Sequence, residues 1–452
     1  MIGFDYGTSN CAVAIMQGDA PKLLTLGEHG KFMPSTLYSP SRETIVNWLS
    51  QQLPNAQQEN FIKERQFQLT KGSSVLRELA YDGITSDLTF GQAALSQYLD
   101  DPEEGYYIKS PKSFLGASGL HPQQISLFED IVASMMSHVK HNSELALGKE
   151  VNQVVIGRPI NFQGLNGEKS NKQAIDILER AAKRIGFKDV EFQFEPVAAG
   201  FEFEASLTDE KKVLVIDIGG GTTDISMLLM GPKLIPLLDR QQHLLGHSGQ
   251  RIGGNDLDIQ LTMRGIMPSL GLDSLAITGK SMPTSFHWQA ASINNINDQT
   301  DFYSGANERS LKELIKTAAS PQLVSRLLKV QQEKLTYQLV NSSEQAKIAL
   351  SDHTEHNIDL GYLDNDLFAQ VTRDTLLQAN RRHLQSIAKL IDQTIAQAAC
   401  QPDVIFVTGG SAKSPVLHQF LQQHFSQKQL VSGDHFGSVT AGLARWSQRI
   451  FS

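Results

Sequence analysis

Short apolar segments that run into glycine-rich turns occur twice in the chain. Residues 2–10 and 213–224 both read as an apolar strand, an aspartate, glycines and hydroxyl side chains. A second apolar stretch follows each turn, at residues 12–16 and 225–230. A strand, a turn and a further strand are typical of a β-hairpin, whereas a dinucleotide-binding fold would continue into a helix. We therefore predict two hairpins of similar design.

Helical periodicity and buried strands alternate between these hairpins. Residues 173–185 and 381–399 carry apolar side chains at helical spacing, and helix-stop residues follow at Gly186 and Pro402. The apolar runs 154–157 and 404–407 are typical of buried strands. Alternating strands and helices predict an α/β architecture.

Two regions depart from this pattern. Residues 41–60 are rich in Gln, Ser and Asn, which predicts a loop or a mobile arm. Residues 271–306 read as an insertion that contains Trp288, Phe302 and Tyr303. A small satellite core is the favoured interpretation of these aromatics, and a contact surface is the alternative.

Composition and charge exclude several classes of protein. Of 452 residues, 40% are apolar and 19% are charged, as in ordinary globular proteins, and the net charge of −8 argues against sequence-independent nucleic-acid binding. The two cysteines, Cys11 and Cys400, have no zinc-site spacing. No signal peptide and no apolar stretch of about 20 residues is present. We expect a cytoplasmic protein with no nucleic-acid or membrane partner.

The two turns suit phosphate binding. Glycines let backbone N–H groups approach a phosphate, and Thr or Ser hydroxyls add donors. Asp5 and Asp217 beside the turns would repel phosphate unless a cation lies between, which indicates Mg²⁺. Ordinary glycine turns are the alternative, but the matching Asp and Thr positions disfavour it. Residues 279–281 resemble the end of a Walker loop, although Ser274 stands where its first glycine should be.

Several segments then resemble a known family. The turns at 3–10 and 215–224 resemble the phosphate motifs of the actin-like ATPase superfamily. Further segments resemble the DnaK-type heat-shock protein 70 family, namely 112–116, 194–200, 252–258, 344–351, 408–415 and 434–445. The resemblance covers nearly the whole chain, and it is strongest to bacterial members without a peptide-binding domain.

The resemblance implies an α/β, actin-like, heat-shock-type ATPase fold. Two lobes would each have a mixed β-sheet core flanked by helices, with the nucleotide in a cleft between them. Lobe I would comprise residues 1–207, with an exposed subdomain at about 40–126. Lobe II would comprise residues 208–435, with a subdomain at about 253–375 that includes the insertion. Residues 436–452 would form a closing helix that returns to lobe I.

The resemblance also implies roles for individual residues. Asp5 and Asp217 would hold Mg²⁺, mostly through water, and Lys112 would lie beside the γ-phosphate; a surface lysine is its alternative interpretation. The other catalytic positions would be Glu195 behind the metal, Thr222 on the phosphates and Asp224 near the attacking water. The remaining nucleotide contacts would be Gly7, Thr8, Ser9, Asn10, Gly219, Gly220, Gly221 and Thr223 on the phosphate side, and Gly253, Gly254, Asp256, Glu344, Lys347, Ser351, Gly409, Gly410, Ser411 and Lys413 on the adenosine side.

Some positions depart from the family pattern. The family holds adenine between two arginines, and Ile348 and Lys413 occupy those places here. The loss of guanidinium stacking would cost about 0.5–2 kcal/mol, or up to roughly thirty-fold in affinity. Pro159 resembles the family's switch proline, but Gly167 stands where a relay arginine is expected. The family's linker and peptide-binding domain are not recognised after residues 439–451, so we expect no substrate clamping within this polypeptide.

The leading hypothesis is a slow, Mg²⁺-dependent ATPase that acts as a nucleotide switch. It would bind ATP or ADP and act on an unidentified protein partner or co-chaperone in a chaperone-related role. A small-molecule kinase of the same superfamily, an actin-like filament protein and a fold that binds nucleotide without turnover remain the alternatives.

Overall fold

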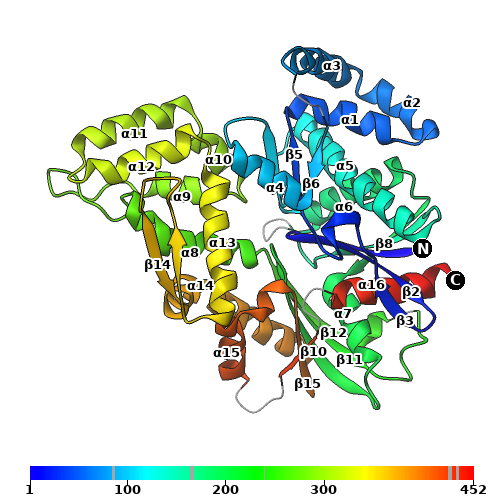
Figure 1. Cartoon of the computed structure of the whole chain (residues 1–452). Coiled ribbons are helices and arrows are strands. Elements are labelled where there is room, and N and C mark those ends of the chain that lie inside the picture. The colour runs from blue at the N-terminus through cyan, green and yellow to red at the C-terminus, as the bar shows by residue number, and fades with distance from the viewer. Residues whose placement is uncertain (84–86, 163–166, 239, 426–429, 434–436) are drawn as a thin grey trace. The chain divides into compact units, whose positions relative to one another are not determined.

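The computed structural model describes residues 1–83, 87–162, 167–238, 240–425, 430–433 and 437–452 (Figure 1). Contacts divide the chain into two compact units. Unit 1 comprises Met1–Arg251, Lys389–Gly410 and Gln427–Ser452, and unit 2 comprises Ile252–Ala388 and Ser411–Ser426. Both glycine turns belong to unit 1. The lobe boundaries expected from the resemblance remain a prediction.

The first sheet of unit 1 contains the first predicted hairpin. Its strands run in the order β3-β2-β1-β8-β9, and β4 pairs with β2. β1 and β2 are antiparallel, whereas β1, β8 and β9 are parallel. The carboxyl ends of β1, β8 and β9 therefore lie at one edge of the sheet. The bounds are β1 Ile2–Tyr6, β2 Asn10–Gln17, β3 Ala20–Leu23, β4 Met33–Pro34, β8 Gln153–Arg158 and β9 Asp189–Phe194.

The second sheet of unit 1 repeats this design and confirms the second hairpin. Its order is β12-β11-β10-β15-β16. β10 and β11 are antiparallel, and Asp217 lies opposite Asp224 in their register. β15 is parallel to β10. The bounds are β10 Lys211–Ile218, β11 Thr223–Met230, β12 Leu244–Gln250, β15 Val404–Thr408 and β16 Leu430–Ser432.

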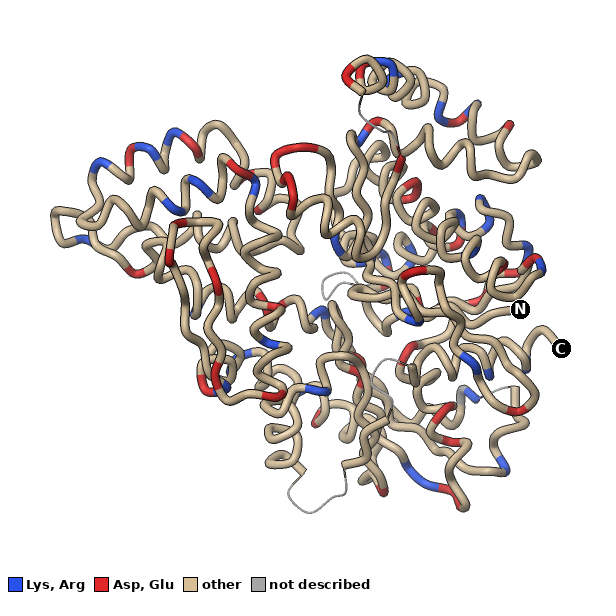
Figure 2. The backbone as a smooth tube through the Cα atoms, viewed as in Figure 1, with Lys and Arg blue, Asp and Glu red and all other residues tan. Residues whose placement is uncertain are grey.

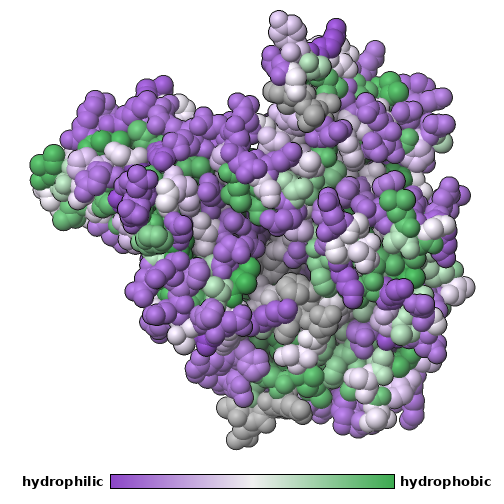
Figure 3. Space-filling model, in the orientation of Figure 1, coloured by the Kyte–Doolittle hydropathy of each residue, from purple (hydrophilic) through white to green (hydrophobic). Residues whose placement is uncertain are grey.

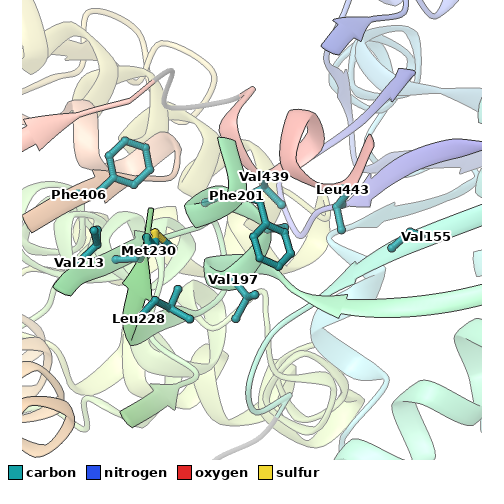
Figure 4. Packing of buried hydrophobic residues seen from close by; sticks show 12 residues of the cluster. Val155, Val197, Phe201, Val213, Leu228, Met230, Phe406, Val439 and Leu443 are labelled. Atoms are coloured by element: carbon teal, nitrogen blue, oxygen red, sulfur yellow. The ribbon is translucent and has the colours of Figure 1, made fainter. Parts of the chain in front are cut away.

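Two helices pack between these sheets and join them into one core. Figure 4 shows side chains of α7 (Glu195–Glu204) and α16 (Ser438–Phe451) among residues of β8, β10, β11 and β15. The helices approach so closely that a Cβ atom at Gly442 of α16 would lie 1.7 Å from the carbonyl oxygen of Ala198 in α7. α16 also covers β1, because a Cβ atom at Gly3 would lie 2.5 Å from the Leu443 carbonyl carbon. This shared core holds both turns in one unit.

Further helices of unit 1 correct one prediction. Residues 41–60 contain helical turns and helices rather than a loop, because Ile45, Val46 and Leu49 are buried and Trp48 packs against Phe90, with ring centroids 5.3 Å apart. The elements here are η2 Arg42–Thr44, α1 Ile45–Gln52, α2 Asn55–Glu64, α3 Gln66–Tyr81, α4 Gly91–Asp100, α5 Pro122–Leu147 and α6 Gly167–Arg184, beside a small sheet of β5 Thr36–Ser39, β6 Thr89–Phe90 and β7 Tyr106–Lys109.

Unit 2 is mainly helical. Within residues 271–306, Phe302 is fully buried, as expected of a satellite core, while Trp288 is 41% exposed and Tyr303 donates or accepts a 2.6 Å hydrogen bond with Thr336. Phe302 therefore fits the satellite core, and the contact surface stays a prediction. The elements are α8 Gly254–Leu261, α9 Ser285–Ala291, α10 Ile296–Phe302, α11 Gly305–Thr317, α12 Pro321–Gln332, α13 Thr336–Asp352, the hairpin β13 Glu355–Asp359 and β14 Phe368–Thr372, α14 Arg373–Ala398, which continues into unit 1, and α15 Pro415–His424.

The surface is mixed in character. Figure 2 shows Lys and Arg interspersed with Asp and Glu along the described chain, and the face drawn in Figure 3 is largely polar, with apolar side chains in scattered groups. Among the described helices, none combines the length and the apolar composition needed to cross a membrane.

Candidate phosphate-binding site

The two glycine turns lie against each other in unit 1. A Cβ atom at Gly220 would lie 1.9 Å from Ser9 Oγ, and one at Gly221 would lie 2.7 Å from Thr8 Cγ2. Any larger residue would push the turns apart. The glycines thus allow the two turns to pack together. This role is additional to the predicted one, which is to let backbone N–H groups approach a phosphate.

Hydrogen bonds hold each turn in shape. Ser35, just before β5, donates from its hydroxyl to the Gly7 carbonyl at 2.7 Å and from its backbone N–H to the Ser9 carbonyl at 2.8 Å. In the second turn, Gly219 N–H donates to the Thr222 carbonyl at 2.9 Å. Ser35 was missed by sequence reasoning, because it lies outside the glycine motif and contacts it only through folding.

Lys112 is brought to the same region by the short helical turn η3 (Pro111–Phe114). Its side chain is buried, with the residue 5% exposed, and Nζ lies 2.5 Å from Glu195 Oε1 and 3.4 Å from the Gly157 carbonyl. Glu195 is the first residue of α7, at the carboxyl end of β9. The alternative interpretation of Lys112 as a surface lysine is therefore wrong.

Carboxylates gather around this lysine, with Asp217, Asp224 and Glu195 buried and Asp5 half-buried. Burial, and next the charge of Glu195, raises the pKa of Asp5 and of Asp224 to about 7. The same two causes raise the pKa of Asp217 well above its usual range. Lys112 lowers all three values, but by less than burial raises them. The site holds more buried negative charge than its lysine compensates.

The carboxylate of Asp224 illustrates this uncompensated charge. Its Oδ1 accepts a 2.7 Å hydrogen bond from the backbone N–H of Ile160, whereas Oδ2 is buried with no hydrogen-bond partner in the described chain. A buried carboxylate oxygen without a partner is costly. Such an oxygen fits the approach of a hydrated cation.

The donor set fits Mg²⁺ held through water. Across the described residues, no three His, Cys, Asp or Glu side chains form a group that could enclose a metal ion directly. Mg²⁺ keeps several of its waters and needs only one or two carboxylates besides phosphate oxygens. Asp5 and Asp217, each at the entrance to a glycine turn, are suited to this role.

Gly409, a predicted adenosine-side glycine, lies beside Asp217. It follows β15, whose Thr408 pairs with Asp217 in register, and it has a φ of +89°. A Cβ atom at Gly409 would lie 2.6 Å from Asp217 Oδ1 and 2.3 Å from the Ile218 carbonyl oxygen. Both the backbone conformation and the packing therefore require glycine here. Gly410 follows as the first residue of the helical turn η7 (Gly410–Lys413).

The predicted adenosine-side residues other than Gly409 and Gly410 lie in unit 2, where some of them contact neighbouring groups of α8. Lys347 Nζ lies 2.8 Å from a carboxylate oxygen of the buried Asp258 and 3.3 Å from the Gly254 carbonyl. Asp256 accepts a 2.9 Å hydrogen bond from Gly253 N–H at the start of α8. Sequence reasoning missed Asp258 as the partner of Lys347, because its contact joins α8 to α13.

The rest of this predicted set is distributed over two elements of unit 2. Glu344 and Ser351 lie on α13, and Ser411 and Lys413 lie on η7. Ile348, also on α13, is 53% exposed. Asn10 begins β2 and Thr223 begins β11, so both belong to the phosphate turns of unit 1.

Comparisons with known proteins identify the family of the chain. The family model described as "Hsp70 protein" matches residues 108–262 and 323–445, which is more than half of the chain. A chaperone protein DnaK of Deinococcus deserti is 21% identical over 432 residues, covering 93% of this chain and 55% of the relative. A chaperone protein dnaK of Emiliania huxleyi is 28% identical over 265 residues, covering 57% of this chain and 36% of the relative. The chain thus spans between about a third and just over half of the length of these relatives. With the mixed α/β architecture expected of the actin-like ATPase fold, the chain belongs to the Hsp70 family.

Proposed function

We propose that the chain binds ATP and ADP with Mg²⁺ at the two glycine turns of unit 1 and hydrolyses ATP slowly. The observation that carries this proposal is the close packing of the two glycine turns beside the carboxylates Asp5, Asp217 and Asp224, one of whose buried oxygens, Asp224 Oδ2, has no hydrogen-bond partner in the described chain. Membership of the Hsp70 family supports a chaperone-type ATPase nucleotide-binding domain.

Each group would have a separate task. The N–H groups of both turns and the hydroxyls of Thr8, Ser9 and Thr222 would donate to the phosphates. Mg²⁺, when bound, supplies positive charge between phosphate oxygens and carboxylates. Asp5 and Asp217 would hold its waters, and Asp224 would help to orient the water near the terminal phosphate.

Lys112 would neutralise the negative charge of the terminal phosphate. Glu195 keeps the ammonium group in place at 2.5 Å, so little reorganisation would be needed when the nucleotide binds. Phosphoryl transfer depends mainly on positioning and charge neutralisation, which these residues provide.

The nucleotide state would control a protein partner, by analogy with the chaperone relatives. The partly exposed Trp288 in residues 271–306 is a candidate contact. A co-chaperone or client protein, a chaperone-related role and a cytoplasmic location all belong to this proposal. Weaker adenine binding than in the relatives is expected from Ile348 and Lys413.

Single-turnover hydrolysis of ATP tests the proposal. We expect release of ADP and phosphate by the wild type with Mg²⁺ and none with excess chelator. Thr222→Val should reduce the rate by about tenfold or more, because it removes one phosphate donor. Thr208→Val, at an exposed position, is the matched control. Hydrolysis that is unaffected by the chelator would refute the role of Mg²⁺, and turnover that requires a metabolite and yields its phosphate ester would favour the kinase alternative.

A further inference from the structure

Arg158 ends strand β8 at the same sheet edge as the first phosphate turn. β8 lies between β1 and β9, and all three are parallel. Arg158 lies opposite Phe194 in the register of β8 and β9, and Glu195 follows Phe194 directly. Ligands of α/β sheets commonly bind at the carboxyl ends of parallel strands. Arg158 thus has a binding-site position that no sequence motif above assigned.

The guanidinium of Arg158 is held by an aromatic ring rather than by a carboxylate. Its Cζ lies 4.0 Å from the centroid of the Phe194 ring, which is a close cation–π contact. Within the described chain, no hydrogen bond or ion pair engages this guanidinium, although the residue is half-buried. By contrast, the buried Arg65 is paired with Asp130 and the buried Arg240 with Glu204.

The surroundings of Arg158 are acidic. Burial lowers its pKa, and the charges of Asp224 and then Glu195 oppose that change, so both carboxylates are near enough to act on it. Yet neither forms an ion pair with Arg158 in the described structure. Two residues further on, Ile160 N–H donates to Asp224 Oδ1, which fixes the backbone beside the site.

Lys112 and Arg158 thus differ in how neighbouring carboxylates engage them. Lys112 already has a short contact with Glu195. The donors of Arg158 are still available, and they form a planar fork that matches phosphate oxygens in pairs. Stacking on Phe194 leaves the edge of the fork free to bind an anion.

We propose that Arg158 binds the terminal phosphate of a nucleoside triphosphate and makes the site distinguish ATP from ADP. This inference rests on the proposed nucleotide binding at the two turns. A diphosphate lacks the group that Arg158 would contact, so Arg158 contributes to the affinity for ATP alone.

Calorimetric titration of the full chain with two ligands, each with Mg²⁺, tests this role. The ligands are ADP and a non-hydrolysable ATP analogue with an imido group between the β- and γ-phosphorus atoms. Arg158→Met should weaken binding of the analogue by about tenfold or more, because charged hydrogen bonds are lost. Binding of ADP should change by less than about twofold. Arg158→Lys should give an intermediate loss for the analogue, since it keeps the charge without the fork. Arg77→Met removes an exposed arginine from α3 and should leave both affinities unchanged.

The outcomes separate this inference from the proposed function. An equal loss for both ligands in Arg158→Met would assign Arg158 a structural role and overturn the inference. Unchanged binding of the analogue would overturn it as well, while leaving the proposed nucleotide site intact. If the wild type bound neither ligand, the proposed function itself would fail, and this inference would fail with it.

Discussion

The glycine turns of unit 1 and the predicted adenosine-side segments of unit 2 both contain buried charged groups. The two regions differ in whether these groups have hydrogen-bond or ion-pair partners. In unit 1, Asp224 Oδ2 and the hydroxyl oxygen of Thr408 are buried without a hydrogen-bond partner in the described chain. In unit 2, Lys347 and Asp258 form an ion pair. The glycine turns therefore keep open polar groups that a ligand would satisfy, whereas in the adenosine-side segments this pair holds α8 and α13 together.

This difference indicates where binding energy should arise. Groups that the fold has already buried and positioned can bind a ligand with little reorganisation. The burial cost of the carboxylates in unit 1 would be relieved by a cation. In unit 2, a nucleotide would have to compete for Lys347 with Asp258. Substitutions at Lys112, Lys347, Asp224 and Ile348 test this difference between the two segments.

Lys112→Met should reduce the rate of ATP hydrolysis by on the order of 100- to 1000-fold, as the loss of a preorganised electrostatic group commonly does. Glu195 would remain in place without its cation. Single-turnover rates are the measurement, with Lys149→Met at an exposed position of unit 1 as the control. A variant that kept more than about a tenth of the wild-type rate would show that Lys112 has only a structural role.

Lys347→Met should destabilise the fold by about 3 kcal/mol, because it leaves the buried Asp258 without its lysine. The double variant with Asp258→Asn should recover most of this loss. Urea denaturation measures both, and Lys312→Met, which breaks an exposed ion pair with Glu308, should cost less than about 0.5 kcal/mol. If the stable double variant still bound ATP much more weakly than wild type, Lys347 would have a direct role in nucleotide binding as well.

Asp224→Asn should stabilise the nucleotide-free protein at alkaline pH. Because the folded-state pKa of Asp224 is about 7 instead of 3.8, the folded chain binds more protons than the unfolded chain between these values. Its contribution to stability therefore falls as pH rises through this window, and the full cost is present above about pH 7. Asparagine keeps an acceptor for Ile160 N–H and removes the charge.

We expect a gain on the order of 2 kcal/mol at pH 8 for Asp224→Asn, with no difference from wild type near pH 4. Chemical denaturation at a series of pH values measures this. Equal stability of the two proteins at pH 8 would show that Asp224 is already compensated, and the contrast between the units would be weaker.

Ile348→Arg should have the smallest effect, a gain in ATP affinity of about three- to tenfold with little change in stability. Position 348 is more than half exposed, so an arginine can be placed there without disturbing the core. Competition binding with ATP and GTP measures the gain and the base preference. Unchanged affinity for both would place Ile348 away from the base.

Much of the candidate phosphate site could be predicted from the sequence, because its signals are local. Both hairpins follow from apolar runs that meet Gly, Thr and Asp within a few residues. The burial of Lys112 against Glu195 could not be derived from periodicity, since it joins two elements far apart in the chain. The family resemblance assigned both residues to one site, but it did not predict their contact.

Tertiary packing explains the other differences between expectation and structure. Residues 41–60 look like a polar loop, but Ile45 and Leu49 find a buried face and the segment becomes helical. Arg158 follows an ordinary strand pattern, and only the register with Phe194 reveals its stacked guanidinium. Asp258 lies in a predicted adenosine-side segment, yet its partner is a lysine of another helix.

Calorimetric titration of ATP, with and without Mg²⁺, into the wild type and Asp217→Asn asks whether the glycine turns bind ATP together with Mg²⁺. Asp217 is buried between the second glycine turn and Gly409, so removal of its charge should abolish the contribution of Mg²⁺. We expect the wild type to bind ATP at least about tenfold more tightly with Mg²⁺ than without it, and Asp217→Asn to lose this difference. Absence of ATP binding by the wild type, or an unchanged Mg²⁺ dependence in Asp217→Asn, would contradict this expectation.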